Sequence, residues 1–459
     1  MFGNIATMKG EIMKSVRILA PTGCMGAGFG VDALERGMTL RPDAIAVDAG
    51  STDQGPYHLG SGVPLYSDRI IKRELASLVQ ASRKARIPFI IGSAGGAGTN
   101  AQVDRVAELV REIAGEMGLH FKLAKIYAEI PKERVVAAIK AGEVRDFEAG
   151  FELTAEDVQA CSGLVAQMGD EPFRHALDQG ADVVIAGRSC DDSAIASFAI
   201  WKGANQALAI HMGKILECGA FSAEPFGMDV MLGTLDDEGF TLEPGSLARR
   251  ASKKSVAAHS LYEREDPFVQ HGPGRVLDFS KCKFEQVDDR RVRVTGTTGQ
   301  RTGDYWIKLE GAKPVGYRSL CIVGVRCPTM ISRIDTVLEQ VRQMTHQRVP
   351  DPSVQIIFRK YGIDAVMRDF EVEKTLPHEV GLVLETIAST QDVAYDACNA
   401  VSGKLAHVSY EGQKNTSGNL AMPYSPRVQN IGLQYEFGAY HLMKVSSPLE
   451  CFPVVMEEV

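Results

Sequence analysis

The chain has 459 residues, of which 45% are hydrophobic and 24% charged, and its formal net charge is −8. This length allows two to four domains of about 100–200 residues, each with a buried core. A mildly acidic chain without a lysine and arginine cluster lacks the basic surface that nucleic acids and anionic membranes require, so we expect neither as a partner.

Residues 1–14 show no hydrophobic periodicity, so we expect them to form a loose extension. From residue 15 onward, short apolar segments alternate with amphipathic ones. Strands are predicted at residues 16–19, 44–47, 88–91 and 182–186. Buried strands that alternate with helices are typical of a parallel sheet covered on both faces. We therefore expect residues 15–240 to form an α/β domain with a mostly parallel, doubly wound sheet.

The pattern changes near residues 230–250, where we place the domain boundary. Residues 232–241 predict a hairpin or an exposed loop, and residues 275–330 predict short antiparallel strands. The last 50 residues show no regular pattern. We expect residues 241–459 to form a smaller α+β domain with an irregular C-terminal tail.

The nine cysteines include no C-x-x-C pair, which is typical of free thiols in a reducing compartment. No apolar run approaches the roughly 20 residues of a membrane-spanning helix, and the first residues do not resemble a signal peptide. These features predict a cytoplasmic protein.

Each of the four predicted strands ends in a loop rich in Gly, Ser, Thr or Asp. Ligands of open α/β sheets bind at the carboxyl ends of the strands, where glycine lets backbone N–H groups approach an anion. We therefore predict a pocket for a carboxylate or phosphate at this edge. The candidate substrate-binding residues are Gly26, Gly28, Asp48, Ser51, Thr52, Ser93, Gly95, Gly96, Thr99, Asn100 and Arg188.

The first glycine-rich loop also invites comparison with the dinucleotide motif G-x-G-x-x-G. Only the variant Gly28-x-Gly30-x-x-Ala33 fits, with Asp48 as the acidic residue. We therefore favour a general anion-binding or tight-turn role for this loop over a nicotinamide (NAD) site.

Three side chains are candidate catalytic residues. Asp53 follows the second strand, Asp191 follows the fourth beside Arg188, and His211 lies on a predicted helix at residues 206–219. Carboxylates and histidine are suited to general acid–base chemistry, and arginine can clamp a carboxylate with two hydrogen bonds. The alternatives are that the acids cap local turns and that His211 is a hydrogen-bonded core residue.

The same loops provide a candidate metal site. The carboxylates of Asp48, Asp53 and Asp191 would suit a divalent cation such as Mg²⁺ if they converge. The sequence leaves open whether a metal is needed.

Together these segments resemble the acyclic terpene utilisation (AtuA) family. The resemblance runs from about residue 15 to residue 450, and it depends on the order of several weak motifs. They lie at residues 23–30, 48–55, 92–100, 187–191, 211–219, 261–263, 274–278 and 291–296. The resemblance implies a bacterial catabolic setting that involves small organic acids or their CoA esters.

We therefore expect an enzyme that binds a carboxylate or CoA ester at the sheet edge and catalyses a lyase, hydratase or isomerase reaction. One alternative is a non-catalytic ligand-binding or accessory subunit of a catabolic complex, and another is a nicotinamide-dependent oxidoreductase. A homo-oligomer or a complex with a small accessory subunit is compatible with the sequence.

Overall fold

The computed structural model describes residues 15–264 and 266–459. The extension expected at residues 1–14 lies outside the described residues. The chain divides into two compact units. The first contains the chain up to Lys313 together with Phe437–Val459, and the second is Pro314–Glu436. The boundary expected near residue 240 falls inside a strand of the first unit, β10 (Gly239–Pro244).

The first unit is of mixed α/β type and is built on a ten-stranded sheet. Its centre is parallel, in the order β1-β2-β3-β7-β4. The bounds of these strands are β1 Val16–Ala20, β2 Ala44–Asp48, β3 Phe89–Gly92, β7 Val183–Ala186 and β4 Lys122–Ile126.

Antiparallel strands extend this sheet on both sides, so the expectation of a mostly parallel sheet was wrong outside its centre. The hairpin of β9 (Met231–Leu235) and β10 pairs with β1, and β15 (Val292–Thr295) and β14 (Lys283–Gln286) continue it. At the other side, β21 (Val454–Glu458) pairs with β4. A tight turn returns the chain directly into an antiparallel pair, whereas a parallel neighbour needs a long crossover.

Alternate side chains of the parallel strands belong to two separate hydrophobic clusters. Ile18 and Val184 pack in one cluster with α7 (Glu171–Asp178), α8 (Ser193–Trp201) and α9 (Gln206–Leu216). Leu19 and Val183 pack in the other with α1 (Val31–Thr39), α3 (Asp68–Ala85) and α4 (Asn100–Met117). Both faces of the parallel strands are therefore buried, which explains their continuous apolar runs.

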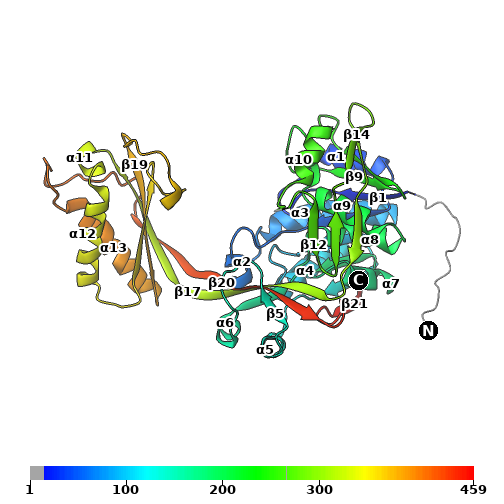
Figure 1. The fold of residues 1–459 in the computed structure, drawn as a ribbon, viewed down its shortest axis with the longest axis horizontal. Helices are drawn as coiled ribbons and strands as arrows, with labels where there is room; N and C mark the ends of the chain where they lie inside the picture. The colour runs from blue at the N-terminus through cyan, green and yellow to red at the C-terminus, as the bar shows by residue number, and fades with distance from the viewer. Residues whose placement is uncertain (1–14, 265) are drawn as a thin grey trace. The chain divides into compact units, whose positions relative to one another are not determined.

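In the second unit β19 pairs antiparallel with both β18 and β17, and the strand order of this sheet continues to β20, as β18-β19-β17-β20. Figure 1 shows α12 and α13 beside each other against this sheet. In chain order these elements are β17 (Tyr305–Val325), α12 (Ile334–Arg348), β18 (Gln355–Tyr361), β19 (Val380–Ala388), α13 (Gln391–His407) and β20 (Val428–Val445). This β-α-β-β-α-β order is that of ferredoxin-like units. The C-terminal tail is therefore not irregular, since it supplies β20 and β21.

Shorter elements complete the two units. A three-stranded sheet is formed by β12 (Val269–Gly272), β13 (Arg275–Asp278) and β16 (Thr298–Arg301). The others are α2 (Tyr57–Ser61), α5 (Lys132–Lys140), β5 (Val144–Asp146), α6 (Ala155–Ala160), β6 (Gly163–Ala166), β8 (Ala223–Glu224), β11 (Arg250–Ala251), α10 (Lys253–Ser260) and α11 (Pro328–Ile331), with 3-10 turns at Gly219–Ser222 and Arg368–Phe370. Across residues 15–264 and 266–459, no helix has the length and apolar character to cross a bilayer.

Candidate functional site

A polar cavity of about 760 Å³ lies in the first unit, and its wall includes the loop that follows β7. The wall also receives side chains from α9, from the segment after α10, and from β17 and β20. Charged residues from four of these segments include Arg188, Asp191, Lys214, Glu263, Arg264 and Lys308, while β20 contributes Tyr440. Segments far apart in the sequence thus contribute opposite charges to one cavity.

Arg188 lies at the carboxyl end of β7 and is 2% exposed. Its guanidinium holds both carboxylate oxygens of Glu310, with Nε 2.7 Å from Oε2 and Nη2 3.3 Å from Oε1. The remaining nitrogen, Nη1, donates to Ser93 Oγ at 3.2 Å and to the Ser189 carbonyl at 3.1 Å. Arg188 therefore already clamps a carboxylate of the protein itself, and its role as a substrate clamp stays a prediction.

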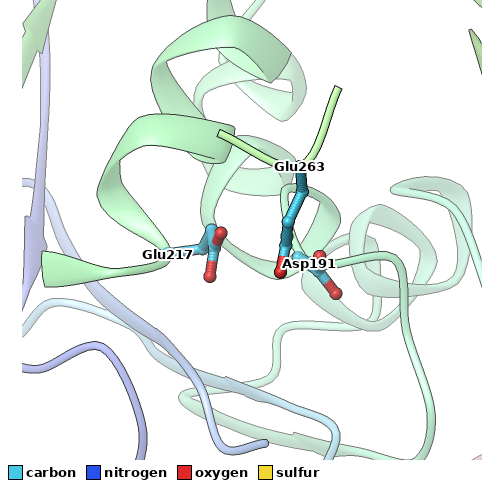
Figure 2. Close-up of side chains that lie close together, drawn as sticks. All are labelled: Asp191, Glu217 and Glu263. Carbon is cyan, nitrogen blue, oxygen red and sulfur yellow. The ribbon is translucent and has the colours of Figure 1, made fainter. Parts of the chain in front are cut away.

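The ammonium group of Lys214, on α9, contacts three carboxylates. Its Nζ lies 3.1 Å from Asp191 Oδ2, 3.0 Å from Glu217 Oε1 and 2.8 Å from Glu263 Oε2. Figure 2 shows how the three acidic side chains, from three separate segments, come close together. Asp191, Lys214, Glu217 and Glu263 are called the lysine–carboxylate cluster below.

The cluster also has the composition of a metal site, because oxygens of its three acids lie within 4.8 Å of one another. Oxygen ligands suit Mg²⁺ or Ca²⁺. A divalent cation there would have to displace the ammonium of Lys214, which already occupies these oxygens. Only Asp191 of the three metal ligands suggested by the sequence belongs to this cluster.

Burial and charge together divide the acids of the cluster into two kinds. Burial raises the pKa of Glu217 to about 7, although Lys214 opposes the rise. Burial also acts to raise the pKa of Asp191, but Lys214 and Arg188 together hold it below its ordinary value. At neutral pH, Asp191 is therefore ionised while Glu217 exchanges its proton readily.

Asp48, the last residue of β2, differs from Asp191 and Glu217 in the surroundings of its carboxyl group. It is 4% exposed, and its Oδ1 atom is buried without a hydrogen-bond partner. Burial raises its pKa well above the ordinary value, and the negative charge of Asp191 raises it further. Both effects favour the protonated form of this carboxyl group.

The model of the acyclic terpene utilisation family protein AtuA matches residues 59–428. The chain belongs to the AtuA family. The matched range contains the whole lysine–carboxylate cluster together with Arg188 and Glu310. No match was found among curated proteins or among solved structures. The description of this family connects its members to acyclic terpene utilisation.

Three of the residues proposed from the sequence line the cavity, namely Asp53, Arg188 and Asp191. Ser51 and Thr52 precede Asp53 in its loop, where Ser51 Oγ accepts the Asp53 N–H at 2.9 Å and Thr52 is buried. Ser93 is not among the residues that line the cavity, but its Oγ atom accepts a hydrogen bond from Arg188, which does line it.

The glycine-rich loops of the AtuA protein use many of their polar groups internally. The Gly26 N–H donates to Glu74 Oε2 at 2.7 Å, and the Gly28 carbonyl accepts from Thr22 at 2.9 Å. The Gly95 carbonyl accepts from Leu65, and the Gly96 N–H donates to the Ser93 carbonyl. These contacts hold loops together, so the expected use of these groups for an anion stays a prediction.

The two residues at the start of α4 also have structural partners. The side chain of Thr99 accepts the Gln102 N–H at 3.3 Å, and the Gln102 side chain accepts the Thr99 N–H at 3.2 Å, so the two residues form a capping box. Asn100 Oδ1 accepts the backbone N–H groups of Ala128 and Glu129.

His211 is fully buried and does not line the cavity. Its two ring nitrogens lie 2.7 Å from the hydroxyl oxygens of Thr297 and Ser260, and its ring packs edge-on against Phe240 and Phe279. Burial lowers its pKa well below the ordinary value, with a smaller contribution from Arg264. The structure thus gives His211 the surroundings of the core histidine that was the alternative interpretation.

Sequence reasoning did not find Lys214, Lys308 or Glu310. A signal existed for Lys214, because Glu217 follows it at the i, i+3 spacing that places two helical side chains together. No local signal indicated Glu310, which reaches Arg188 across 122 residues of sequence.

Proposed function

We propose that this AtuA family member is a bacterial catabolic enzyme that moves a proton on a small organic acid or its CoA ester. The reaction would be of the lyase, hydratase or isomerase type, in the cavity at the carboxyl edge of the parallel strands. The observation that carries the proposal is the lysine–carboxylate cluster on the cavity wall. A volume of about 760 Å³ is within the range of small-molecule sites.

Each group in the cluster has a role in such a reaction. Asp191 is ionised and lines the cavity, so it is placed to accept a proton from the carbon next to a substrate carbonyl. Lys214 and Arg188 lie on either side of it, at 3.1 and 3.7 Å, and would stabilise the negative charge that develops on the substrate.

Glu217 would complete the proton path. It lies behind Lys214, is 6% exposed, and has a pKa of about 7. A group that gains and loses its proton near neutral pH is suited to resupplying the proton that leaves or enters the cavity. Lys214 itself stays protonated, because the charges of Asp191, Glu217 and Glu263 outweigh its burial and raise its pKa well above the ordinary value. Its N–H groups would link Glu217 to Asp191.

A non-catalytic ligand-binding or accessory subunit is the second candidate. It is favoured by the engagement of both Arg188 and Lys214 with protein carboxylates, since a structural ion network has the same geometry. A nicotinamide-dependent oxidoreductase has less support, because the N–H groups of Gly26 and Gly30 donate to Glu74 and Asp229.

Exchange of substrate hydrogen with solvent deuterium separates these candidates. The protein is incubated in D₂O with a panel of short-chain carboxylic acids and acyl-CoA esters, with and without EDTA, and deuterium at the α-carbon is measured by mass spectrometry. We expect exchange with the wild type and none with Asp191→Asn. Glu35→Gln, on the exposed surface, is the matched control and should exchange normally.

The outcome against the proposal is equally specific. Saturable binding of an acid or ester without α-deuterium, in any metal condition, would favour the accessory subunit. Exchange that persists in Asp191→Asn but disappears in Asp53→Asn would transfer the role of base to Asp53, which lines the same cavity.

A further inference from the structure

Arg264 differs from the other cations of the cavity wall. Arg188 and Lys308 both contact Glu310, and Lys214 contacts three acids. Within the described residues Arg264 forms no ion pair, and its Nε and Nη2 atoms are buried without a hydrogen-bond partner. An unpaired charged donor in such a position is costly for the folded protein, so its retention requires an explanation.

The guanidinium of Arg264 is held in one orientation. Its central carbon lies 3.6 Å from the centre of the Phe279 ring, which is itself 6% exposed. Stacking on an aromatic face fixes the plane of a guanidinium while leaving its edges available. The Nε and Nη2 atoms form one such edge, with two parallel N–H donors that match the two oxygens of a carboxylate.

Arg264 also keeps its charge, although burial lowers its pKa to about 10. Asp192, whose negative charge acts to raise the pKa of Arg264, has its own partners. One carboxylate oxygen accepts from Arg275 and Ser193, and the other accepts from Gln270. The positive charge of Arg264 is therefore available to a ligand.

Gln270, on β12, supplies a second unpaired group on the same cavity wall. Its Nε2 atom donates to Asp192 Oδ2 at 3.3 Å, which fixes which end of the amide is nitrogen. Its Oε1 atom is buried and has no donor. Among the described residues, two that line this wall thus keep buried polar atoms without partners: a pair of donors on Arg264 and an acceptor on Gln270.

We propose that Arg264 binds the carboxylate of a small hydroxycarboxylic acid and that Gln270 accepts a hydrogen bond from its hydroxyl group. This subsite rests on the proposed function in one respect, because it assigns the substrate class of the same cavity. Phosphate, which carries more negative charge, fits less well, since Asp53, Asp191 and Glu263 also line the wall. A carboxylate, with a single negative charge, would neutralise Arg264 and meet weaker repulsion from these acids than phosphate would.

Binding measurements on the full chain test this assignment. The ligands are lactate and 3-hydroxybutyrate, their parent acids propionate and butyrate, methyl 3-hydroxybutyrate, and inorganic phosphate, each titrated by calorimetry at pH 7.5. We expect Arg264→Gln to weaken binding of the acids by about 10- to 100-fold, the value of a hydrogen bond to a charged group, and to leave the ester unaffected. Gln270→Ala should remove the preference for a hydroxy acid over its parent acid.

Two further variants keep the test independent of folding. Arg264→Lys retains the charge but loses the paired donors, so it should bind the acids with intermediate affinity. Arg250→Gln, whose side chain is 66% exposed, is the matched control and should bind like the wild type. Near-ultraviolet circular dichroism confirms that each variant is folded.

Three results would overturn the assignment: wild-type protein that binds none of the four acids, Arg264→Gln that binds them normally, or phosphate that binds as tightly as the hydroxy acids. The proposed function fails by a different result. Binding without α-deuterium exchange would contradict the proposed enzyme activity but support the subsite. Exchange that is unaffected in Arg264→Gln would support the enzyme activity but contradict the subsite.

Discussion

The surroundings of Glu217 predict how the stability of the folded protein depends on pH. In the folded protein it is 6% exposed, and burial raises its pKa from an ordinary 4.5 to about 7. Each tenfold change in proton affinity is worth about 1.4 kcal/mol, so ionising this group costs the folded state about 3 kcal/mol more than the unfolded state. We therefore expect Glu217→Gln, which resembles the protonated side chain, to be more stable than the wild type at pH 8 by up to about 3 kcal/mol.

The sign of the pH dependence follows from the direction of the shift. Between pH 4.5 and about 7, the folded state binds a proton on Glu217 that the unfolded state has lost. The contribution of this group to stability is thus complete below pH 4.5 and is lost as the pH rises through 7. The advantage of Glu217→Gln should consequently shrink toward zero at pH 4.5.

Urea denaturation followed by tryptophan fluorescence, at several values between pH 4.5 and pH 8, measures this difference. Both tryptophans, Trp201 and Trp306, belong to the first unit, which contains Glu217. Glu35→Gln, at an exposed position, controls for the loss of a negative charge. A Glu217→Gln variant that is destabilised equally at pH 5 and pH 8 would refute the reasoning, because it would mean that Glu217 is a favourable ion-pair partner rather than a desolvated acid.

Lys214→Met leaves three carboxylates without their shared cation, so we expect the free energy of unfolding to fall by about 3–5 kcal/mol at pH 8 and by less at pH 5. The same urea assay measures both values, and equal losses would contradict the prediction. Thr99→Ala removes the cap of α4 and should cost about 1 kcal/mol by urea denaturation, whereas Thr99→Ser should be nearly neutral. His211→Gln should lose less stability than the wild type as the pH falls below 6.5, because His211 takes up a proton there in the unfolded state but not when it is buried in the folded state. If the melting temperatures of both proteins fall equally with decreasing pH, this prediction is wrong.

Much of the first unit was accessible to sequence reasoning because its strands are short, apolar and buried on both faces. Residues 44–47 and 88–91 predicted β2 and β3 almost to the residue. The strand β20 was missed because its 18 residues mix glycine, asparagine and charged side chains, so neither a helical nor a strand period dominates.

The site was harder to predict because its charges are compensated over long sequence separations. Asp53, Arg188 and Asp191 were found since they follow strands, which is where α/β sheets place polar side chains. Glu310 was not, because it meets its cation only through the fold. The partners also change the interpretation: an arginine that resembles a substrate clamp in the sequence proves to hold an internal carboxylate.

The glycines explain how these charges can be buried so close together. A Cβ atom on Gly98 would lie 2.2 Å from the backbone nitrogen of Arg188, and one on Gly50 would lie 2.5 Å from the Cα atom of Gly96. The loops after β2, β3 and β7 are thus in direct backbone contact, which real side chains would prevent. This contact brings Ser93 to Arg188. The glycine clusters of this chain therefore mark positions where backbone meets backbone, and the ligand is to be sought beside them, at the charged side chains that the close packing holds in place.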